Sequence, residues 1–381
     1  MAVSVVLSAR LEMIDLFVYR AGGDAAVHAT ALYEVTGPDG LPFTYPPIAA
    51  LLFAPLAVLP LLTAKIVLTC ASLAALVRVC WLSVAGPSRR RGRRAAVLVL
   101  LALCMEPVHA TLGFGQVNLL VMWLVVEDVS SAVGRRFGGV LTGIAGAIKL
   151  VPTGFVLLYL AAGRRRDAVR TAATFVGAAA IGVLLPYAAA WQYWTDLAYQ
   201  PDRVGGVTYL GNQSLYGVLA RAADGQPPGW LWLPIAVALV GAACHIATQL
   251  WQCDLRLAAT CVVGFAMLAA SPISWTHHWV WFVPAVGTLW QVRRARRAAI
   301  ILLATIIAAT ATYAVWWLGP LSDVFGSHTT LVEPVLGAVY LLLGLAYIVV
   351  MMFEPDPQQI WHRAAVVPRP ERTRHGADVV P

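Results

Sequence analysis

The chain has 381 residues, of which 60% are hydrophobic and only 12% are charged. Because about a quarter of the residues in soluble domains are charged, this composition excludes a soluble globular enzyme and indicates a membrane protein with on the order of ten helical spans. The 27 Lys and Arg residues, which give a net charge of +8, cluster between the apolar runs. The charge therefore reports membrane topology rather than binding to nucleic acid.

The apolar segments and the Arg-rich connectors between them predict the topology. Nine segments are predicted to span the membrane: Ile66–Ala85, Ala95–Leu112, Gln116–Val126, Ala168–Ala190, Trp230–Leu250, Leu255–Ala270, His278–Val292, Ala298–Leu318 and Pro334–Phe353. The positive-inside rule places the Arg-rich connectors in the cytoplasm. Alternation along the chain then places four loops on the outer side, over residues 10–46, 191–229, 271–277 and 319–333.

Two further apolar stretches do not fit as simple spans, and we predict that they are re-entrant or interfacial. Prolines interrupt Pro47–Leu62, and Gly138–Ala162 has arginines at both ends. The IKLVP sequence around Lys149 predicts a helix that breaks and turns back while it lines a cavity, since non-helical backbone at membrane depth needs such a setting.

The sequence therefore predicts an all-α fold. We expect one transmembrane domain over residues 1–353, with about nine to eleven membrane helices including re-entrant segments, and a disordered cytoplasmic tail over residues 354–381. The six cysteines lie mostly in or beside apolar runs without metal-ligand spacing, so we interpret them as packing residues.

Asp15 is the first candidate for chemistry, because it lies among apolar neighbours in the predicted first outer loop. A carboxylate at an apolar boundary has a raised pKa, which suits a general base. The alternative interpretation is an interfacial Asp that forms an ion pair with Arg10 or Arg20.

Glu106, Gln116 and Asn118 lie near the outer ends of two predicted spans. Ionisable groups inside the membrane are functional candidates because hydrocarbon does not solvate them. The alternative is a polar kink at Pro107, with Gln116 and Asn118 serving only to tie helices together.

Lys149, in the predicted helix break, is one of two lysines in the chain. Its ammonium would suit an anionic phosphate held close to the bilayer. The alternative interpretation is that the Lys149 side chain extends to the cytoplasmic headgroups.

The segment Ser271–Trp281 places His277 and His278 among tryptophans. Adjacent residues on a helix point about 100° apart, so the two histidines are a poor chelating pair and no metal site is expected. Imidazole beside indole, as in Trp275, suits a sugar-binding pocket in which one histidine contacts a phosphate. The aromatic loop over residues 191–229 is typical of a lid or an acceptor-binding surface.

Taken in order, the motifs resemble those of glycosyltransferase family 87, whose members are GT-C-type membrane enzymes that use polyprenyl-phosphate sugars in mycobacteria and related bacteria. The motifs are D-L-x-V-Y at Asp15–Tyr19, F-T-Y-P-P at Phe43–Pro47, E-P-V at Glu106–Val108, G-Q-V-N at Gly115–Asn118, I-K-L-V-P at Ile148–Pro152, N-Q-S-L at Asn212–Leu215 and S-P-I-S-W-x-H-H-W at Ser271–Trp279. One departure is that only nine residues precede Arg10, where the family has a first transmembrane helix.

The resemblance implies a polyprenyl-phosphate-mannose-dependent α-mannosyltransferase in the plasma membrane, with its site facing outward and its C-terminus in the cytoplasm. Its acceptor would be a glycolipid or lipoglycan of the phosphatidylinositol mannoside or lipomannan type, and the new linkage would be α-(1→2). Asp15 matches the family's catalytic base. The reaction would invert the anomeric carbon and require neither cofactor nor metal.

The other motif residues would bind the substrates. Lys149, His277 and His278 are expected to contact the donor phosphate. The residues expected to bind sugar or acceptor are Tyr19, Tyr45, Glu106, Gln116, Asn118, Asn212, Gln213 and Trp275.

Two alternatives remain at this level. An arabinofuranosyltransferase of the same family would use the same base with a different lipid-linked sugar. A lipid or sugar transporter would need alternating access and no catalytic base.

Overall fold

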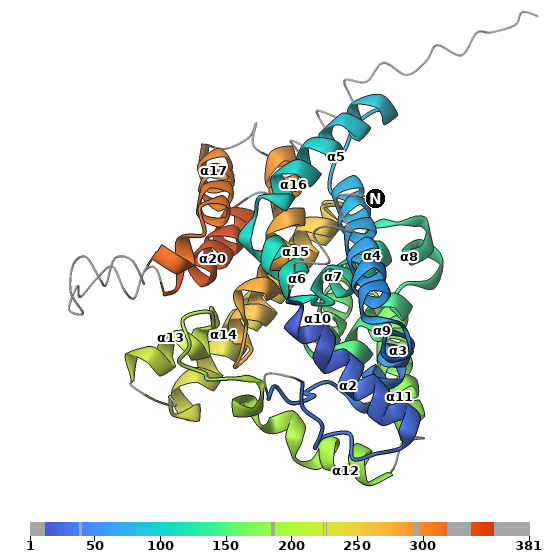
Figure 1. Cartoon of the computed structure of the whole chain (residues 1–381). Helices are drawn as coiled ribbons and strands as arrows, with labels where there is room; N and C mark the ends of the chain where they lie inside the picture. The colour runs from blue at the N-terminus through green and yellow to red at the C-terminus, as the bar shows by residue number, and fades with distance from the viewer. Residues whose placement is uncertain are drawn as a thin grey trace, which may run out of the picture.

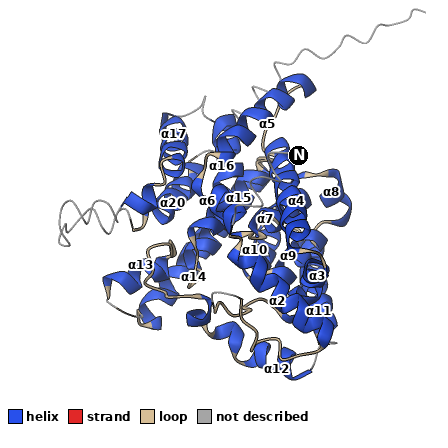
Figure 2. Cartoon of the chain, viewed as in Figure 1, coloured by secondary structure: helices blue, strands red, loops and turns tan. Residues whose placement is uncertain are grey.

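The computed structural model describes residues 12–37, 40–183, 187–223, 225, 227–292, 297–317 and 337–353. Within these ranges the chain is helical, and its only β-type pairs are isolated bridges, Thr36 with Pro42 and Asn212 with Trp275 (Figure 2). The predicted all-α fold is confirmed for the part of the chain that is described. The predicted outer loop over residues 319–333 and the tail over residues 354–381 lie outside it.

The helices of the first half begin with α2, which the sequence analysis left as part of a loop. They are α2 (Ile14–His28), α3 (Pro47–Val58), α4 (Leu61–Leu82), α5 (Ser88–Leu103), α6 (Glu106–Phe114), α7 (Asn118–Ser130), α8 (Ala132–Phe137), α9 (Val140–Ile148), η1 (Val151–Gly154), α10 (Phe155–Ala161) and α11 (Arg165–Gly182). Those of the second half are α12 (Tyr187–Thr195), η2 (Leu197–Tyr199), η3 (Pro201–Val204), α13 (Leu215–Ala222), α14 (Gly229–Gln252), α15 (Arg256–Ala270), η4 (Thr276–Trp281), α16 (Phe282–Val292), α17 (Arg297–Ala311), η5 (Ala314–Trp317) and α20 (Val339–Met352).

Prolines set several of these boundaries. Pro60 and Pro87 are the residues just before α4 and α5, and Pro107 lies in the first turn of α6. Proline is accepted at a helix start but cannot continue a helix from the preceding turn. The predicted span Ala95–Leu112 is therefore not one straight helix: α5 and α6 are separate helices with a bend of 69° between them.

Two described helices, α4 and α14, are long and apolar enough to cross a bilayer by themselves, and α5 with α6 makes a third span if the bent pair crosses as one. These helices fit a polytopic membrane protein. The remaining spans and the re-entrant assignments stay predictions. The break at Lys149 is confirmed, because α9 ends at Ile148 and Lys149 has extended backbone angles.

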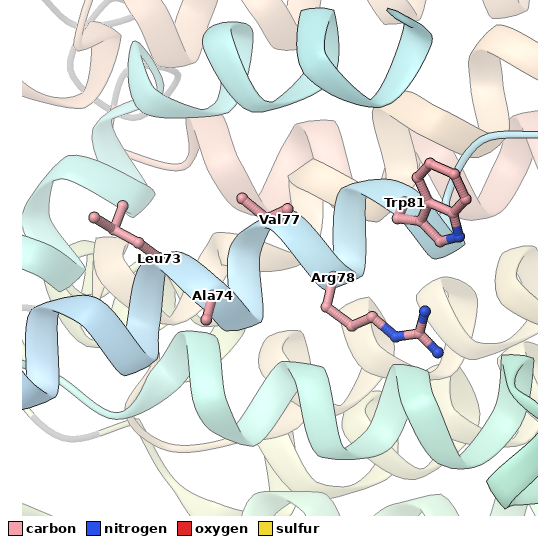
Figure 3. Close-up of a pocket in the computed structure, with 5 residues that line it drawn as sticks. All are labelled: Leu73, Ala74, Val77, Arg78 and Trp81. Atoms are coloured by element: carbon pink, nitrogen blue, oxygen red, sulfur yellow. The ribbon is translucent and has the colours of Figure 1, made fainter. Parts of the chain in front are cut away.

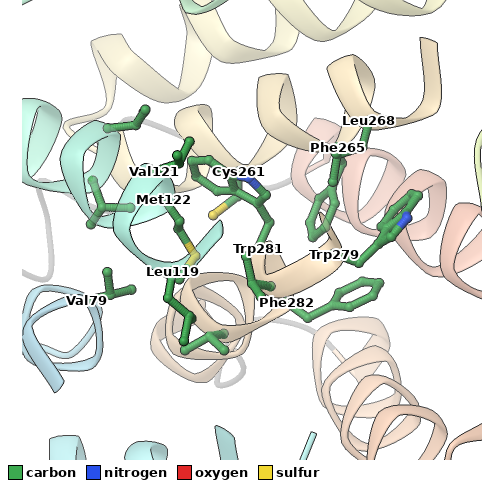
Figure 4. Packing of buried hydrophobic residues seen from close by; sticks show 14 of the residues in the cluster. Val79, Leu119, Val121, Met122, Cys261, Phe265, Leu268, Trp279, Trp281 and Phe282 are labelled. Carbon is green, nitrogen blue, oxygen red and sulfur yellow. The ribbon is translucent and has the colours of Figure 1, made fainter. Parts of the chain in front are cut away.

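The core is centred on α15, which is buried along nearly its whole length. It packs against α14 and α20 and contacts α7, α10 and α16. Figure 4 shows Cys261 and Phe265 of α15 packed with Trp281 and Phe282. Cys80 is also buried, but Cys70 and Cys104 are exposed on the protein, so the packing interpretation is wrong for those two cysteines.

A basic segment lies at one end of the molecule. The basic start of α5 lies at the upper end of the view in Figure 1, whereas α2 and α12 lie at the lower end. Helix α2 packs along α3, and α3 also contacts α9 and α11. This packing brings the predicted first outer loop beside the helix break at Lys149.

Candidate functional site

The turn between α6 and α7 positions the start of α2. Gly115 in this turn has φ +68°, and a Cβ there would lie 3.1 Å from the Cβ atoms of both Met13 and Leu16. The backbone N–H of Met13 donates to the carbonyl of Gly113 at 3.1 Å. A glycine is required here by both backbone angle and space, and the close approach places Asp15 beside Gln116.

Lys149 reaches into a polar cluster. Its ammonium donates to Gln116 Oε1 at 3.1 Å and to Asn118 Oδ1 at 2.7 Å, and its Nζ lies 3.4 Å from His278 Nε2. An ammonium has three N–H donors, and two of these meet the amide oxygens of Gln116 and Asn118. The Nζ also lies 5.5 Å from the centre of the Tyr45 ring. These contacts contradict the alternative that Lys149 extends to the cytoplasmic headgroups.

Two tyrosines complete the cluster on the side of α2. Tyr19 donates to Gln116 Oε1 at 2.8 Å and lies 3.0 Å, hydroxyl to hydroxyl, from Tyr45. Tyr45 is 3.3 Å from the same amide oxygen, and the Tyr19 ring stacks on Phe53 with centroids 4.3 Å apart. Both phenols are buried. Their hydroxyls are thus fixed by neighbouring protein groups.

Asp15 is partly buried in this cluster. Burial raises the pKa of its carboxyl from 3.8 to about 6, although the charge of Lys149 and a hydrogen bond with Gln116 act in the opposite direction. Arg20 is not its partner, because the Arg20 guanidinium donates to the backbone carbonyls of Leu56 and Leu59. Arg10 lies outside the described residues. The carboxylate therefore faces Lys149 rather than Arg20.

The histidines come from η4, which is held against α6 and α7. The carbonyl oxygen of His277 accepts from Thr111 Oγ1 at 3.1 Å and from Asn118 Nδ2 at 3.0 Å. The two imidazole rings lie 4.8 Å apart and nearly perpendicular. His277 Nε2 is buried without a hydrogen-bond partner among the described residues, whereas His278 faces Lys149.

Glu106 lies in a neighbouring group of polar residues. It is buried, and its carboxylate accepts from Trp316 Nε1 at 3.1 Å and from the Tyr340 hydroxyl at 2.9 Å. A hydrogen bond with Thr276 ties it to the residue before His277. Glu106 thus links the start of η4 to Trp316 and Tyr340.

The side-chain amides of Asn212 and Gln213 form hydrogen bonds with backbone groups of other segments. Asn212 Nδ2 donates to the carbonyls of Val207 and Pro272, both at 3.0 Å, and Asn212 Oδ1 accepts from the backbone of Ser274. Gln213 Nε2 donates to the carbonyls of Leu210 and Gly337 at 2.9 Å. Neither amide bonds to Asp15 or Lys149 in the described part of the chain. Asn212 thus fastens the segment that leads into the histidines, whereas Gln213 holds the chain just before α20.

Trp275 belongs to an aromatic group formed with Tyr209 and Trp316. The Tyr209 ring lies 5.9 Å from the Trp275 ring and 6.1 Å from the Trp316 ring, and its side chain is 57% exposed. Arg221 donates to the backbone carbonyl of Tyr209, and the carbonyl of Trp275 accepts from the backbone of His278 at 2.8 Å. The sequence analysis missed Thr111, because its partner is a distant backbone carbonyl that no local motif reveals.

Two surface hollows of the described structure lie away from the cluster around Lys149. Figure 3 shows one of about 470 Å³ along α4, lined by Leu73, Ala74, Val77, Arg78 and Trp81. Arg78 makes two hydrogen bonds of 2.8 Å to Glu127, so its charge is paired. A second hollow of about 310 Å³ lies at the start of α15. The candidate site is therefore defined by the hydrogen-bonded cluster around Lys149 and not by these hollows.

No three His, Cys, Asp or Glu side chains come together as a metal site among the residues that the structure describes. That the protein requires neither metal nor cofactor stays a prediction from the sequence.

Comparison with known proteins identifies the class of protein. The model of glycosyltransferase family 87 matches residues 43–272, and the chain belongs to this family. It is 33% identical over 335 residues to the polyprenol-phosphate-mannose-dependent alpha-(1-2)-phosphatidylinositol mannoside mannosyltransferase of Mycolicibacterium smegmatis, covering 80% of this chain and 75% of the relative.

Other relatives carry related names. The Mycobacterium tuberculosis protein with the same name is 31% identical over 340 residues, or 80% of this chain and 79% of its own. A phosphatidylinositol pentamannoside mannosyltransferase of M. smegmatis, also polyprenol-phosphate-mannose-dependent and alpha-(1-2), is 34% identical over 300 residues, or 75% of this chain and 72% of its own. No solved structure matches the chain.

Proposed function

We propose that this chain transfers mannose from polyprenyl-phosphate-mannose to a glycolipid or lipoglycan of the phosphatidylinositol mannoside type, forming an α-(1→2)-mannoside. The observation that carries the proposal is the Asp15 carboxylate facing the Lys149 ammonium in one hydrogen-bonded cluster of a family 87 chain. A base and a phosphate-binding cation are the two groups that this transfer needs.

The reaction is a single displacement with inversion at the anomeric carbon. Asp15 accepts the proton of the acceptor hydroxyl while the hydroxyl oxygen forms its bond to that carbon. The bond between the carbon and the phosphate oxygen breaks, and its electron pair leaves with polyprenyl phosphate. The leaving group departs as a stable anion, so one carboxylate suffices where a glycosidase uses two.

Lys149 and His278 stabilise the phosphate charge that develops. Their side-chain nitrogens lie 3.4 Å apart, close enough to contact one phosphate group. A preorganised donor of this kind is often worth about 3 kcal/mol in the transition state. The scheme requires no metal and no cofactor.

The topology of the proposed enzyme follows from its charges. We propose a single multi-pass domain in the plasma membrane, a GT-C-like bundle of about nine to eleven membrane helices over residues 1–353. The Arg-rich connectors and the tail over residues 354–381 face the cytoplasm, and Asp15 faces outward.

The test uses purified protein in vesicles with labelled polyprenyl-phosphate-mannose and a phosphatidylinositol mannoside acceptor. The wild-type protein is expected to release polyprenyl phosphate and form an α-mannoside. Asp15→Asn is expected to lower kcat about 10²-fold to 10⁴-fold, the usual contribution of a general base. Asp24→Asn is the matched control, because Asp24 lies on the same helix with an exposed side chain beside His28.

Three outcomes would overturn the proposal. Equal turnover by wild-type protein and Asp15→Asn would show that Asp15 is not the catalytic base. Transfer from a lipid-linked arabinose but not from the mannose donor would indicate the arabinofuranosyltransferase. Movement of lipid or sugar across the vesicle membrane without release of polyprenyl phosphate would indicate a transporter.

A further inference from the structure

One amide connects the groups of the candidate site. Gln116 Oε1 accepts from Tyr19 at 2.8 Å, from Lys149 at 3.1 Å and from Tyr45 at 3.3 Å. The same side chain is hydrogen-bonded to Asp15. Gln116 itself is buried, with 4% of its surface exposed, so these protein groups and not solvent are its surroundings.

The two ends of the amide are chemically different. The oxygen only accepts hydrogen bonds and the nitrogen only donates them. Because the oxygen faces an ammonium and two phenols, the NH₂ group is left for the carboxylate of Asp15. The phenols thus set which way the amide points.

The amide separates two opposite charges. Asp15 and Lys149 interact electrostatically, yet the described residues include no ion pair between them within 4.0 Å. A direct pair would occupy the oxygens that must accept a proton and the ammonium hydrogens that must meet a phosphate. It would also make the carboxylate a weaker base.

We infer that Gln116 is a positioning residue: its amide bridges Asp15 and Lys149 and keeps them from pairing directly, so that each stays available to a different substrate. This inference rests on the proposed function and deepens it. It replaces the expectation that Gln116 binds sugar, since its amide oxygen is already occupied by three protein donors.

The charged and titratable groups around Asp15 define what a pH measurement reports. Tyr19 faces it from its own helix, Tyr45 from the loop before α3, and Lys149 from the end of α9. His278 from η4 acts through Lys149. A change at Gln116 therefore alters the electrostatic interaction between Asp15 and Lys149 directly.

The experiment compares Gln116→Met with Gln116→Glu. Methionine keeps the approximate length and removes the amide, so Asp15 and Lys149 are expected to pair directly. We expect kcat to fall at least 10-fold, with the acidic inflection of the kcat pH profile about one pH unit lower. Glutamate adds a second negative charge beside Asp15, so the inflection is expected to move to higher pH.

The opposite shifts distinguish positioning from folding. A merely structural role would lower the melting temperature of both variants without moving the inflection in opposite directions. Gln291→Met is the matched control, because Gln291 bonds the carbonyl of Ser83 at the other end of α4, and its inflection is expected to equal that of the wild-type protein.

Two failures are separable. If wild-type protein does not transfer mannose, the proposed function is wrong. If the wild-type protein transfers mannose and both Gln116 variants keep its inflection, or only their KM for a sugar substrate rises, the positioning role is wrong while the proposed function stands.

Discussion

At the scale of residues, the site depends on charged groups that the surrounding protein keeps from solvent. Asp15, Lys149 and His278 come from three separate segments of the chain. Their side chains meet where α2, the end of α9 and η4 come together, and Gln116 lies between the carboxylate and the ammonium. In the proposed mechanism, the chemistry at this site therefore depends on the protonation state of the Asp15 carboxyl.

The first consequence is a pH dependence of the rate. In the proposed mechanism the carboxylate form of Asp15 is the base, and burial raises the pKa of this group to about 6. Below that pH the group is protonated in the free protein, so kcat/KM is expected to fall about tenfold per pH unit, and above it kcat/KM is expected to be level until another group titrates. Measuring kcat/KM between about pH 4.5 and 8 checks this. An inflection near 4, as for an exposed Asp, would contradict the buried environment.

Sequence patterns found the charged residues more readily than the amides. An Asp and a Lys in an apolar chain need partners, so Asp15 and Lys149 were identifiable from residue type alone. Asn212 and Gln213 were expected to bind sugar, yet their amides hold the carbonyls of Pro272 and Gly337. Such contacts depend on how distant loops pack, which the spacing of residues does not encode.

At the scale of elements, the turn between α6 and α7 controls where α2 lies. Gly115→Ala is expected to strain the backbone at φ +68° and to push Met13 and Leu16 away. We expect a stability loss of about 1 kcal/mol or more and lower turnover, because Asp15 moves with α2.

Gly113→Ala provides the control, since a Cβ at Gly113 meets nothing within 4 Å. Thermal unfolding and mannose transfer are measured for both variants. Equal behaviour of the two would show that the close approach at Gly115 does not position Asp15.

The outer loop before α13 is expected to bind the acceptor. The exposed ring of Tyr209 is fixed between Trp275 and Trp316, and such a face can stack on the C–H groups of a sugar. Tyr209→Ala is expected to raise the KM for the acceptor several-fold with little change in kcat. Tyr209→Phe, which keeps the ring, is expected to have a KM for the acceptor close to that of the wild-type protein.

Tyr199 supplies the comparison, because it lies in the same predicted outer loop with 75% of its side chain exposed. Tyr199→Ala is expected to keep the wild-type KM. The same increase in KM for both alanine variants would mean that the loop acts as a general membrane contact and not as a sugar-binding surface.

The accuracy of sequence prediction for the elements depended on proline and on length. The break at Lys149 was predictable because polar and proline residues interrupt an apolar run. The bend between α5 and α6 entered the sequence analysis only as the alternative of a polar kink at Pro107, because apolar residues continue on both sides of Glu106 and Pro107. Helix α2 was missed because Arg20, two glycines and Asp24 interrupt its apolar residues, which form too short a stretch to indicate a span.

At the scale of the whole molecule, two groups of contacts meet at η4. Thr111 and Asn118 hold it from α6 and α7, and Asn212 fastens the segment before it. The lower end of the molecule in Figure 1 carries α2 and α12, opposite the basic start of α5. The basic start of α5 thus lies at the other end of the molecule from α2 and α12, and the proposed topology places these two ends on opposite sides of the membrane.

This separation predicts which positions a membrane-impermeant thiol reagent reaches in intact cells. Tyr199→Cys is expected to be labelled from outside, whereas Arg89→Cys, at the exposed start of α5, is expected to be labelled only after permeabilisation. The background lacks the exposed Cys70 and Cys104 and retains the buried Cys80 and Cys261, whose replacement would disturb the core. Because the two positions lie on opposite sides in the proposed topology, labelling in the reverse order would place Asp15 in the cytoplasm and exclude mannose transfer on the outer face.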